Sequence, residues 1–483
     1  MAAGGAACRH RSRRTGAGRL TVGGVVQVLT IETPSLGDRS YLITDGTAAV
    51  VIDPQRDIDR ILALVKQHQV HVTHVLETHI HNDYVTGGLE LARHSGAEYF
   101  VEAHEEVGFD RVAIGDGDEL KVGSFVVRAM STPGHTPHHL SYGAYEDGRA
   151  VAVFTGGSML YGTVGRTDLI SEDATDQLTR AQFRSVRALA VELGDGVAVY
   201  PTHGFGSFCS STASSGSDRS TIGEERKANM ALTVDDEDVF VARLLAGLTA
   251  YPSYYAHMGP ANREGPGPVD LSPAQPMDIA ELRRRITDGQ WVVDLRSRRA
   301  YATSHVIGTV NVEYDEKFVT YLAWTMPWGT PVTLIADTAE DIAAAQRDLV
   351  RVNIDRPAGA AAGGVAAWGD AGPRGSYQVA SFADLATALA QGDVVVLDVR
   401  RDDEWAAGHI RDAIHVPLHA LSERLAEVPT GEVWVHCGSG YRAAIATSQL
   451  EQPDRTPILI DDDWENASAT PGLTVIQAGV SRG

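Results

Sequence analysis

The chain is short of cysteine, of long apolar runs and of positive charge. Its 483 residues include three cysteines, Cys8, Cys209 and Cys437, which lie far apart and give no disulfide framework, so a reducing cytoplasmic location is expected. No apolar run approaches the roughly 20 residues that span a bilayer, and we expect no membrane insertion. With 41 Lys and Arg against 63 Asp and Glu, the net charge is −22. This argues against a nucleic acid partner, because no broad face would neutralise phosphates.

Acidic residues are missing from residues 1–24, a segment that contains several arginines: Arg9, Arg11, Arg13, Arg14 and Arg19. An Arg-rich stretch without acids is typical of organelle transit peptides. Its many Ala and Gly residues favour instead a disordered basic leader. Mitochondrial import therefore stays the alternative to a cytoplasmic location.

Two histidines and a carboxylate occupy alternate positions after the mostly apolar run 72–76: His79, His81 and Asp83. Alternate residues of an extended segment point to one face, so the two rings can converge on one ion. Imidazole nitrogens suit zinc or ferrous iron, and a carboxylate adds a hard oxygen ligand. His135 follows a Thr-Pro-Gly turn, and His203 closes another expected strand. These histidines predict a metal centre at the ends of several strands.

Histidine-bearing strand ends in this order resemble the metallo-β-lactamase fold. The sequence around these histidines is also similar to the persulfide dioxygenase branch of this fold family. The similarity covers roughly residues 25–265, and the segments that carry it are 77–88, 131–137, 164–168 and 203–207. The resemblance implies an α/β fold, an αββα sandwich over residues 25–250. It also implies a ferrous ion that binds a thiol persulfide and dioxygen and gives sulfite, with Arg166 and Thr167 near the substrate.

Two positions depart from this family. Tyr84 stands where dinuclear hydrolases such as glyoxalase II have a further histidine, and a phenol with a pKa of ~10 is a poor ligand at neutral pH. Gly157 stands where relatives have an aspartate that bridges two metals or completes a single-iron site. We therefore expect one metal, Fe²⁺ with Zn²⁺ as the alternative. Gly157→Asp should tighten iron binding if the loop tolerates a side chain.

The resemblance, taken with these departures, implies the ligand assignment. His79 and His135 are the first candidates for ligands, and His81 is a candidate to fill the gap left by Gly157. Asp83 and His203 are expected to orient water or the ligands from outside.

Gly- and Pro-rich segments divide the rest of the chain. Residues 205–222 are rich in Gly and Ser and predict a mobile loop, and residues 251–274 predict a linker. An internal repeat follows, in which a strand runs into Asp294-Leu295-Arg296 and again into Asp398-Val399-Arg400. The repeat resembles tandem rhodanese domains, at 275–372 and 377–475.

Cys437 lies between an expected strand and an expected helix, in a loop that continues Gly438-Ser439-Gly440-Tyr441-Arg442. Backbone N–H groups at a helix N-terminus stabilise a thiolate, and the glycines let the loop curl around the sulfur. The loop resembles the rhodanese active site, with Cys437 as sulfur carrier, Arg442 as its catalytic partner and residues 438–441 as the substrate cradle. The first copy has no cysteine at the corresponding Ala336-Asp337-Thr338. Cys209 is either a persulfide-accepting thiol near the metal or incidental.

The sequence thus predicts a sulfur-metabolism enzyme that uses a thiol persulfide or another small sulfur compound together with dioxygen. One alternative is a zinc-dependent thioester hydrolase like glyoxalase II. Another is a sulfur-binding or regulatory protein whose metal site has decayed. Homo-oligomer formation stays open.

Overall fold

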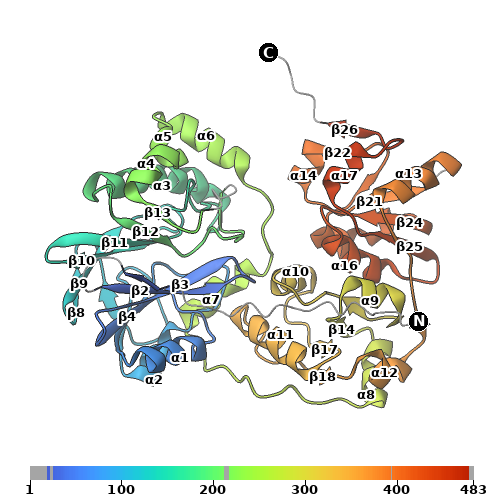
Figure 1. The fold of residues 1–483 in the computed structure, drawn as a ribbon, viewed down its shortest axis with the longest axis horizontal. Helices are drawn as coiled ribbons and strands as arrows, with labels where there is room; N and C mark the ends of the chain where they lie inside the picture. Colours follow the sequence, from blue (N-terminus) through green and yellow to red (C-terminus); the bar gives the residue numbers. More distant parts are fainter. Residues whose placement is uncertain (1–18, 22–25, 212–216, 393, 478–483) are drawn as a thin grey trace, which may run out of the picture.

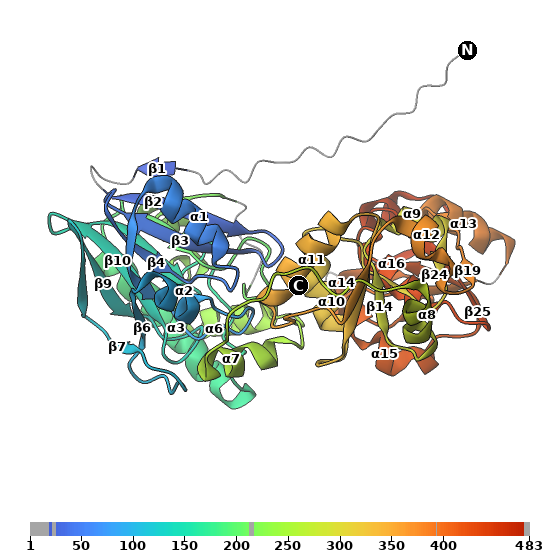
Figure 2. The ribbon, with the colours of Figure 1, turned by 90° about the horizontal axis from the view of Figure 1, so that it is seen from below.

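The computed structural model describes residues 19–21, 26–211, 217–392 and 394–477. In Figure 1 the blue-to-green half, which carries the predicted metal site, lies at the left, and the yellow-to-red half lies at the right. Figure 2 shows the two halves end to end. Among the described residues, no helix has the length and apolar character needed to cross a bilayer.

The first half contains two sheets that face each other. One sheet pairs its strands in chain order: β1 (Arg19–Thr21), β2 (Gln27–Thr33), β3 (Asp38–Thr44), β4 (Ala48–Ile52), β5 (His71–Leu76), β6 (Glu98–Glu102) and β7 (Val112–Ile114). The other sheet has the order β13 (Ser220–Thr221), β12 (Ala198–Pro201), β11 (Arg149–Gly156), β10 (Leu140–Glu146), β9 (Phe125–Ser131) and β8 (Glu119–Val122). Buried Tyr41, Phe125 and Phe154 pack in one cluster between them, as alternating inward side chains of facing sheets do.

Helices cover both outer faces, which confirms the predicted αββα sandwich. The first sheet packs against α1 (Asp59–His68) and α2 (Gly88–Ser95) through a separate apolar cluster. The second sheet packs against α3 (Glu172–Glu192), α4 (Ile222–Ala228), α5 (Met230–Thr233) and α6 (Glu237–Gly247).

Two segment predictions are wrong in part. Residues 19–21 of the predicted leader form β1, which pairs with β2, and residues 1–18 and 22–24 lie outside the described residues. The predicted linker 251–274 contains helix α7 (Tyr255–Glu264), with Pro260 inside it. Tyr255 and Met258 of this helix are buried in the same cluster as Tyr84. Burial of this apolar face therefore outweighs the helix-breaking composition. Of the predicted loop 205–222, residues 212–216 lie outside the described residues, and β13 and the start of α4 occupy its end.

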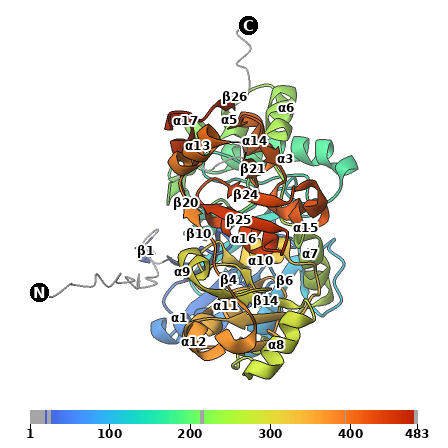
Figure 3. The same ribbon diagram turned by 90° about the vertical axis from the view of Figure 1, so that its right-hand side faces the viewer.

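The second half contains two parallel sheets with corresponding strand orders. The first has β16 (Val310–Asn311), β14 (Trp291–Asp294), β17 (Val332–Ile335) and β18 (Gly359–Ala361). The second has β23 (Ile414–His415), β21 (Val395–Asp398), β24 (Gly431–His436), β25 (Arg455–Ile460) and β20 (Val379–Ala380). In Figure 3 the red second unit lies above the yellow first one.

Helices and short antiparallel pairs complete both units. The first adds α8 (Ile279–Thr287), α9 (Arg298–Thr303), β15 (His305–Val306), α10 (Phe318–Thr325), α11 (Ala339–Arg351), α12 (Gly364–Trp368) and β19 (Arg374–Gly375). The second adds α13 (Phe382–Gln391), α14 (Asp402–Ala407), β22 (Gly408–Ile410), α15 (Leu421–Arg424), α16 (Tyr441–Leu450), α17 (Trp464–Ala469) and β26 (Val475–Gln477).

The Asp-x-Arg repeat makes the same structure in both units. Arg296 Nη2 donates to Asp294 Oδ2 at 2.7 Å, and Arg400 Nη2 donates to Asp398 Oδ2 at 2.6 Å. In each unit the same Nη2 also donates to the backbone carbonyl of the residue that caps the C-terminus of the next helix, Ser304 or Gly408. The shared strand order and this shared ion pair agree with the internal repeat inferred from the sequence.

The first repeat unit docks on the metal-bearing half through buried charges. Arg351, near the end of α11, donates Nη2 to Asp57 Oδ2 at 2.7 Å and also pairs with Asp348. The backbone N–H of Val85 donates to Arg351 O at 2.7 Å, directly after the metal motif. Burial alone would raise the pKa of Asp57, but the charges of Arg351 and Arg60 lower it to about 2.

Acid should weaken this contact. The pKa of Asp57 is depressed from the ~3.9 of an unfolded chain, so its ionised carboxylate stabilises the native chain above pH ~4. That contribution is lost as the pH falls toward about 2.

We expect Arg351→Ala to lower the free energy of unfolding by about 3–5 kcal/mol, because it leaves the buried Asp57 carboxylate without its main partner. Urea unfolding followed by tryptophan fluorescence measures the loss. The control Arg356→Ala removes an exposed pair with Asp270 and should cost less than about 1 kcal/mol. Equal losses in the two variants would contradict the docking role.

Candidate functional site

The motif with the first two histidines follows β5, at the C-terminal edge of the first sheet. The turn is anchored by Asp53, which accepts from the Thr78 backbone N–H at 2.7 Å and from the Thr78 hydroxyl at 2.8 Å. Asp53 adopts a left-handed conformation, with φ 51°. His79, His81 and Asp83 are all buried. The strand end and the Asp53 anchor therefore hold all three side chains inside the protein.

His135 and His203 reach the same place from the second sheet. His135 lies in the turn after β9, and His203 lies directly after β12. The ring centroids of His79, His135 and His203 are 4.8, 5.3 and 5.4 Å apart. Nε2 of His203 lies 3.4 Å from Nε2 of His79. The structure thus brings together histidines from three distant parts of the sequence, of which His79 and His203 are 124 residues apart.

Each of these three rings has its Nδ1 occupied by a neighbour. Nδ1 of His79 lies 2.8 Å from the Thr78 hydroxyl, Nδ1 of His135 donates to Arg166 O at 2.7 Å, and Nδ1 of His203 lies 2.9 Å from Asp38 Oδ1. Metal-bound histidines show this pattern, because the outer partner fixes the tautomer and leaves the other nitrogen for the ion. His203, predicted to act from outside, therefore lies within the donor set. Asp83 Oδ2 lies 3.2 Å from His203 Nδ1, and its predicted role in orienting the ligands stays a prediction.

The His81 ring has the opposite orientation, because its Nε2 and not its Nδ1 contacts neighbouring side chains. Its Nε2 lies 3.0 Å from the Tyr84 hydroxyl, 3.3 Å from Asp53 Oδ1 and 3.4 Å from Glu77 Oε2. Its Nδ1 is buried and has no hydrogen-bond partner, and the same is true of Asp83 Oδ1. Donor atoms of His79, His81 and His203 lie within 4.8 Å of one another. Buried unpaired donors beside three imidazoles fit a bound Fe²⁺ or Zn²⁺.

The protonation of the rings follows from their surroundings. Burial, together with neighbouring histidines, lowers the pKa of His79 well below its usual value and that of His135 to about 3. Both rings are therefore neutral, as metal ligation requires. Burial also lowers the pKa of His203, but Asp83 and Asp38 outweigh it and raise that pKa well above its usual value. A metal and a proton therefore compete for His203.

Tyr84, predicted to offer no ligand for a second metal, packs against His81. Its hydroxyl contacts His81 Nε2 and lies 3.4 Å from the Asp53 carbonyl oxygen. Burial and the nearby Asp53 and Glu77 raise the pKa of Tyr84 well above its usual value, so the phenol stays protonated. Tyr84 therefore supplies no ionised ligand beside His81, and the number of metal ions stays a prediction.

Gly157 is packed against the metal site and leaves no room for a side chain. A Cβ atom there would lie 2.1 Å from Cδ2 of His135 and 2.7 Å from its Nε2. Gly165 packs equally tightly against Gly157, since a Cβ atom on Gly165 would lie 2.2 Å from the Gly157 carbonyl oxygen. The packing contradicts the expectation that Gly157→Asp tightens iron binding, because any side chain at this position displaces His135.

We therefore expect Gly157→Ala and Gly157→Asp to weaken metal binding by on the order of 10–100-fold, the scale of losing a group that orients a ligand. Metal titration of apoprotein measures this. Gly194→Ala is the control, because nothing lies within 4 Å of a Cβ at this exposed glycine and its φ is not in the left-handed region. Tighter binding in Gly157→Asp would show that the loop makes room for the carboxylate.

The residues predicted near the substrate already have partners within the protein. Arg166 is buried, pairs with Asp168 at 2.7 Å and donates to the carbonyl oxygens of Phe208 and Thr249. Thr167 bonds to the Thr179 hydroxyl at 2.6 Å. Both hold the walls of the site in place, and their contact with a substrate stays a prediction. Cys209 is buried, with its sulfur within 4.8 Å of donor atoms of His135 and His203, so it is not a solvent-exposed loop thiol.

Sequence reasoning missed several outer residues of the site. His139 stacks on His79 with centroids 5.0 Å apart and accepts from the Gly157 N–H at 3.0 Å. Asp38 and Asp53 hold His203 and His81. Asp53 could have been found from the sequence, because it follows a buried strand, as the histidines of the site do. The sequence contains no comparable indication for Asp38, because this residue begins a strand far from the histidine motifs.

Cys437 lies between β24 and α16, as predicted, and is buried. Gly440, in the left-handed region with φ 81°, caps α16. Arg442 forms a two-pronged ion pair with Glu404, at 2.5 and 2.7 Å. Its Nη2 would lie 3.1 Å from a Cβ on Gly438, so the guanidinium rests against the residue next to Cys437. A thiol at a helix N-terminus beside a fixed cation suits a nucleophilic thiolate.

The first unit has a different loop at this place. After β17, Asp337 follows Ala336, and Thr338 caps α11 by accepting from the Asp341 N–H. This loop therefore supplies a helix cap and has no thiol.

Comparison with known proteins supports both domains. Residues 39–203 match the metallo-beta-lactamase superfamily, and residues 381–469 match the rhodanese-like domain. The chain contains a metallo-β-lactamase domain followed by a rhodanese-like domain.

Similar proteins have two different activities in their names. The chain is 29% identical over 205 residues, 42% of this chain and 72% of the relative, to human "Persulfide dioxygenase ETHE1, mitochondrial". It is 26% identical over 211 residues, 39% of this chain and 90% of the relative, to "Hydroxyacylglutathione hydrolase GloC" of Haemophilus influenzae. A metallo-beta-lactamase structure from Staphylococcus aureus superposes with a TM-score of 0.62 at 25% identity, and covers 70% of this chain and 99% of that one.

Proposed function

We propose that this protein is a sulfur-metabolism enzyme with a persulfide dioxygenase centre and a sulfurtransferase centre. The observation that carries the proposal is the donor set of His79, His135 and His203, beside a tyrosine and a glycine where a second metal would need ligands. The rhodanese-like domain with its buried Cys437 supplies the sulfur-handling part. The similarity to a persulfide dioxygenase over 72% of that relative agrees with it.

His79, His135 and His203 would hold the metal, with His81 Nδ1 available as a further donor. A bound ferrous ion would supply the one-electron chemistry needed to bring a persulfide sulfur and dioxygen together. The residues of the chain do the rest. Thr78, Arg166 and Asp38 fix the tautomers of the three rings. The buried surroundings exclude water, which protects a reactive sulfur species from side reactions.

At the second centre, the Cys437 thiolate would attack the outer sulfur of a donor such as thiosulfate. A bond forms between the two sulfurs, the donor's S–S bond breaks, and sulfite leaves with the electron pair. Cyanide can then take the outer sulfur as thiocyanate and return the thiolate. Glu404 fixes Arg442 against the loop throughout.

Assays of two activities on the same protein test the proposal against the hydrolase activity that stands in the name of the other relative. The purified protein should consume dioxygen and form sulfite when given glutathione persulfide, and should leave S-lactoylglutathione intact. Hydrolysis of S-lactoylglutathione without persulfide-dependent oxygen uptake would overturn the proposal. Neither reaction in metal-loaded protein would favour a binding or regulatory role.

A further inference from the structure

The segment that carries His81 and Asp83 has no regular secondary structure. Residues 78–85 lie between β5 and α2, outside the described helices and strands. Residues 81–86 form the metal loop, and all of them except Asn82 are buried. Buried backbone N–H and C=O groups need hydrogen-bond partners, and strand or helix partners are missing here. The partners that the metal loop does have therefore decide where it lies.

Asn262 on α7 supplies three of these partners. Its Nδ2 donates to His81 O at 2.8 Å and to Tyr84 O at 2.9 Å. Its Oδ1 accepts from the Thr86 N–H at 2.9 Å. An amide group has two N–H donors, and both are used on the metal loop. Asn262 is 1% exposed, so one buried side chain joins the first, middle and last parts of the loop.

Helix α7 presents Asn262 on the face that it buries. The buried residues of this helix have the spacing i, i+3, i+4 and i+7 of a single helix face. They are Tyr255, Met258, Gly259 and Asn262. Gly259 lets the helix come close, since a Cβ atom there would lie 2.6 Å from Asn82 Oδ1. Helix α7 follows the residues 39–203 that match the metallo-beta-lactamase superfamily, so the metal loop is held by a helix from outside that match.

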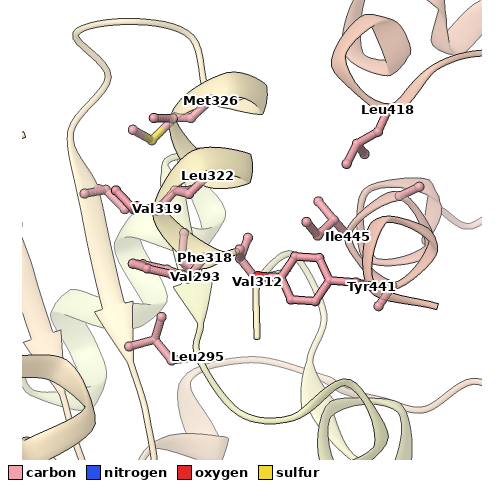
Figure 4. Packing of buried hydrophobic residues seen from close by; sticks show 14 of the residues in the cluster. Val293, Leu295, Val312, Phe318, Val319, Leu322, Met326, Leu418, Tyr441 and Ile445 are labelled. Atoms are coloured by element: carbon pink, nitrogen blue, oxygen red, sulfur yellow. The ribbon is translucent and has the colours of Figure 1, made fainter. Parts of the chain in front are cut away.

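The first repeat unit also supports the metal loop. The Val85 N–H donates to Arg351 O at 2.7 Å. Tyr84 and Val85 belong to an apolar cluster that extends into this unit, where Figure 4 shows Val319 and Leu322 of α10. In such surroundings a buried backbone group that loses its partner is costly to leave unpaired. The three bonds of Asn262 are therefore hard to replace.

The position of the metal loop affects the arrangement of the donor atoms. His79 precedes the loop and follows Thr78, which Asp53 anchors. His81 and Asp83 are carried by the loop itself. Each has one buried atom without a hydrogen-bond partner, His81 Nδ1 and Asp83 Oδ1. A shift of the loop would move both atoms relative to His79, and groups that orient ligands in this way tune a metal site.

We propose that Asn262 is a positioning residue of the metal centre, which fixes the metal loop so that His81 and Asp83 keep their places beside His79. The inference rests on the metal centre of the proposed function and not on the reaction that occurs there. It implies that the loop has its final shape before an ion binds. Loss of Asn262 should therefore weaken metal binding and alter the geometry of the ligands.

Cobalt binding to metal-free protein tests this proposal. Co²⁺ binds the same nitrogen and oxygen donors as Fe²⁺ and Zn²⁺, and its visible absorption spectrum changes with the number and geometry of its ligands. Asn262→Leu keeps a side chain of similar size and removes all three hydrogen bonds, and Asn262→Ala removes the bulk as well. Both variants should bind Co²⁺ about 10–100-fold more weakly and should shift its spectrum. Wild-type affinity and spectrum in both folded variants would overturn the proposal.

The matched control is Asn229→Ala, in the same domain. Asn229 is also buried, its Nδ2 donates to Leu160 O and Thr163 O, and its Oδ1 accepts from the Ala231 N–H. Urea unfolding of the metal-free proteins should show a loss of stability in this control too. Its Co²⁺ affinity and spectrum should stay at the wild-type values. The same loss of affinity and the same spectral shift in the control would make the effect one of general stability and overturn the positioning role.

Hydrogen exchange of the wild type gives a second test that needs no variant to fold. The Thr86 N–H should exchange slowly in metal-free protein, because Asn262 Oδ1 accepts it, and added metal should slow it little further. Fast exchange without metal and protection only with metal would show that the ion shapes the loop, and would overturn the proposal. A metal-loaded wild type that consumes no oxygen with a persulfide would instead overturn the dioxygenase function and leave the positioning role standing.

Discussion

Alanine at His79, His135 or His203 is expected to abolish stable metal binding and persulfide-dependent oxygen consumption. Removing a group that only orients a ligand costs roughly 10–100-fold in metal affinity, and removing a ligand should cost more. The geometry includes His203 here, because its Nε2 lies 3.4 Å from Nε2 of His79 and Asp38 holds its other nitrogen. Metal content after gel filtration and an oxygen electrode measure the two losses.

The control is His138→Ala, in the same turn as His135. His138 is 41% exposed at its side chain, and its Nδ1 lies 3.6 Å from Glu105 Oε1. Metal content and oxygen uptake should stay at the wild-type level. Full metal content in His203→Ala would return His203 to the outer role that the sequence suggested.

Cys437→Ser is expected to abolish thiosulfate:cyanide sulfurtransferase activity, by on the order of 10⁴-fold or more, the scale of losing a nucleophile. A serine hydroxyl does not ionise at neutral pH, so the loop and Arg442 have no anion to stabilise. Oxygen consumption should stay within about twofold, because residues without shared contacts act independently. Mass spectrometry after thiosulfate treatment should find added sulfur on the Cys437 peptide.

Cys209→Ser is the companion variant. Its thiol is buried beside His135 and His203, in a different domain from Cys437, and sulfurtransferase activity should persist. Added sulfur on the Cys209 peptide and none on Cys437 would move the carrier role to the metal domain.

The sequence predicted what depends on short stretches of chain. The motif around His79, the turn at His135 and the loop at Cys437 each carry a local signal, because backbone spacing alone decides which side chains share a face. The repeated Asp-x-Arg segments likewise form their ion pair within three residues.

What the sequence could not give depends on residues brought together from far apart. The role of Asp38 arises only when β3 lies beside the end of β12. The lack of space at Gly157 arises from the ring of His135. The buried face of α7 could not be predicted from the Gly- and Pro-rich composition of its segment. Such contacts leave no mark within a local stretch of sequence.

The most direct test of the account is the number of metal ions per chain in protein purified without oxygen, measured by elemental analysis beside an accurate protein concentration. We predict one iron per chain, held by His79, His135 and His203, because Tyr84 and Gly157 offer no ligands for a second ion. Two zinc ions per chain would contradict the account and would favour the thioester hydrolase instead.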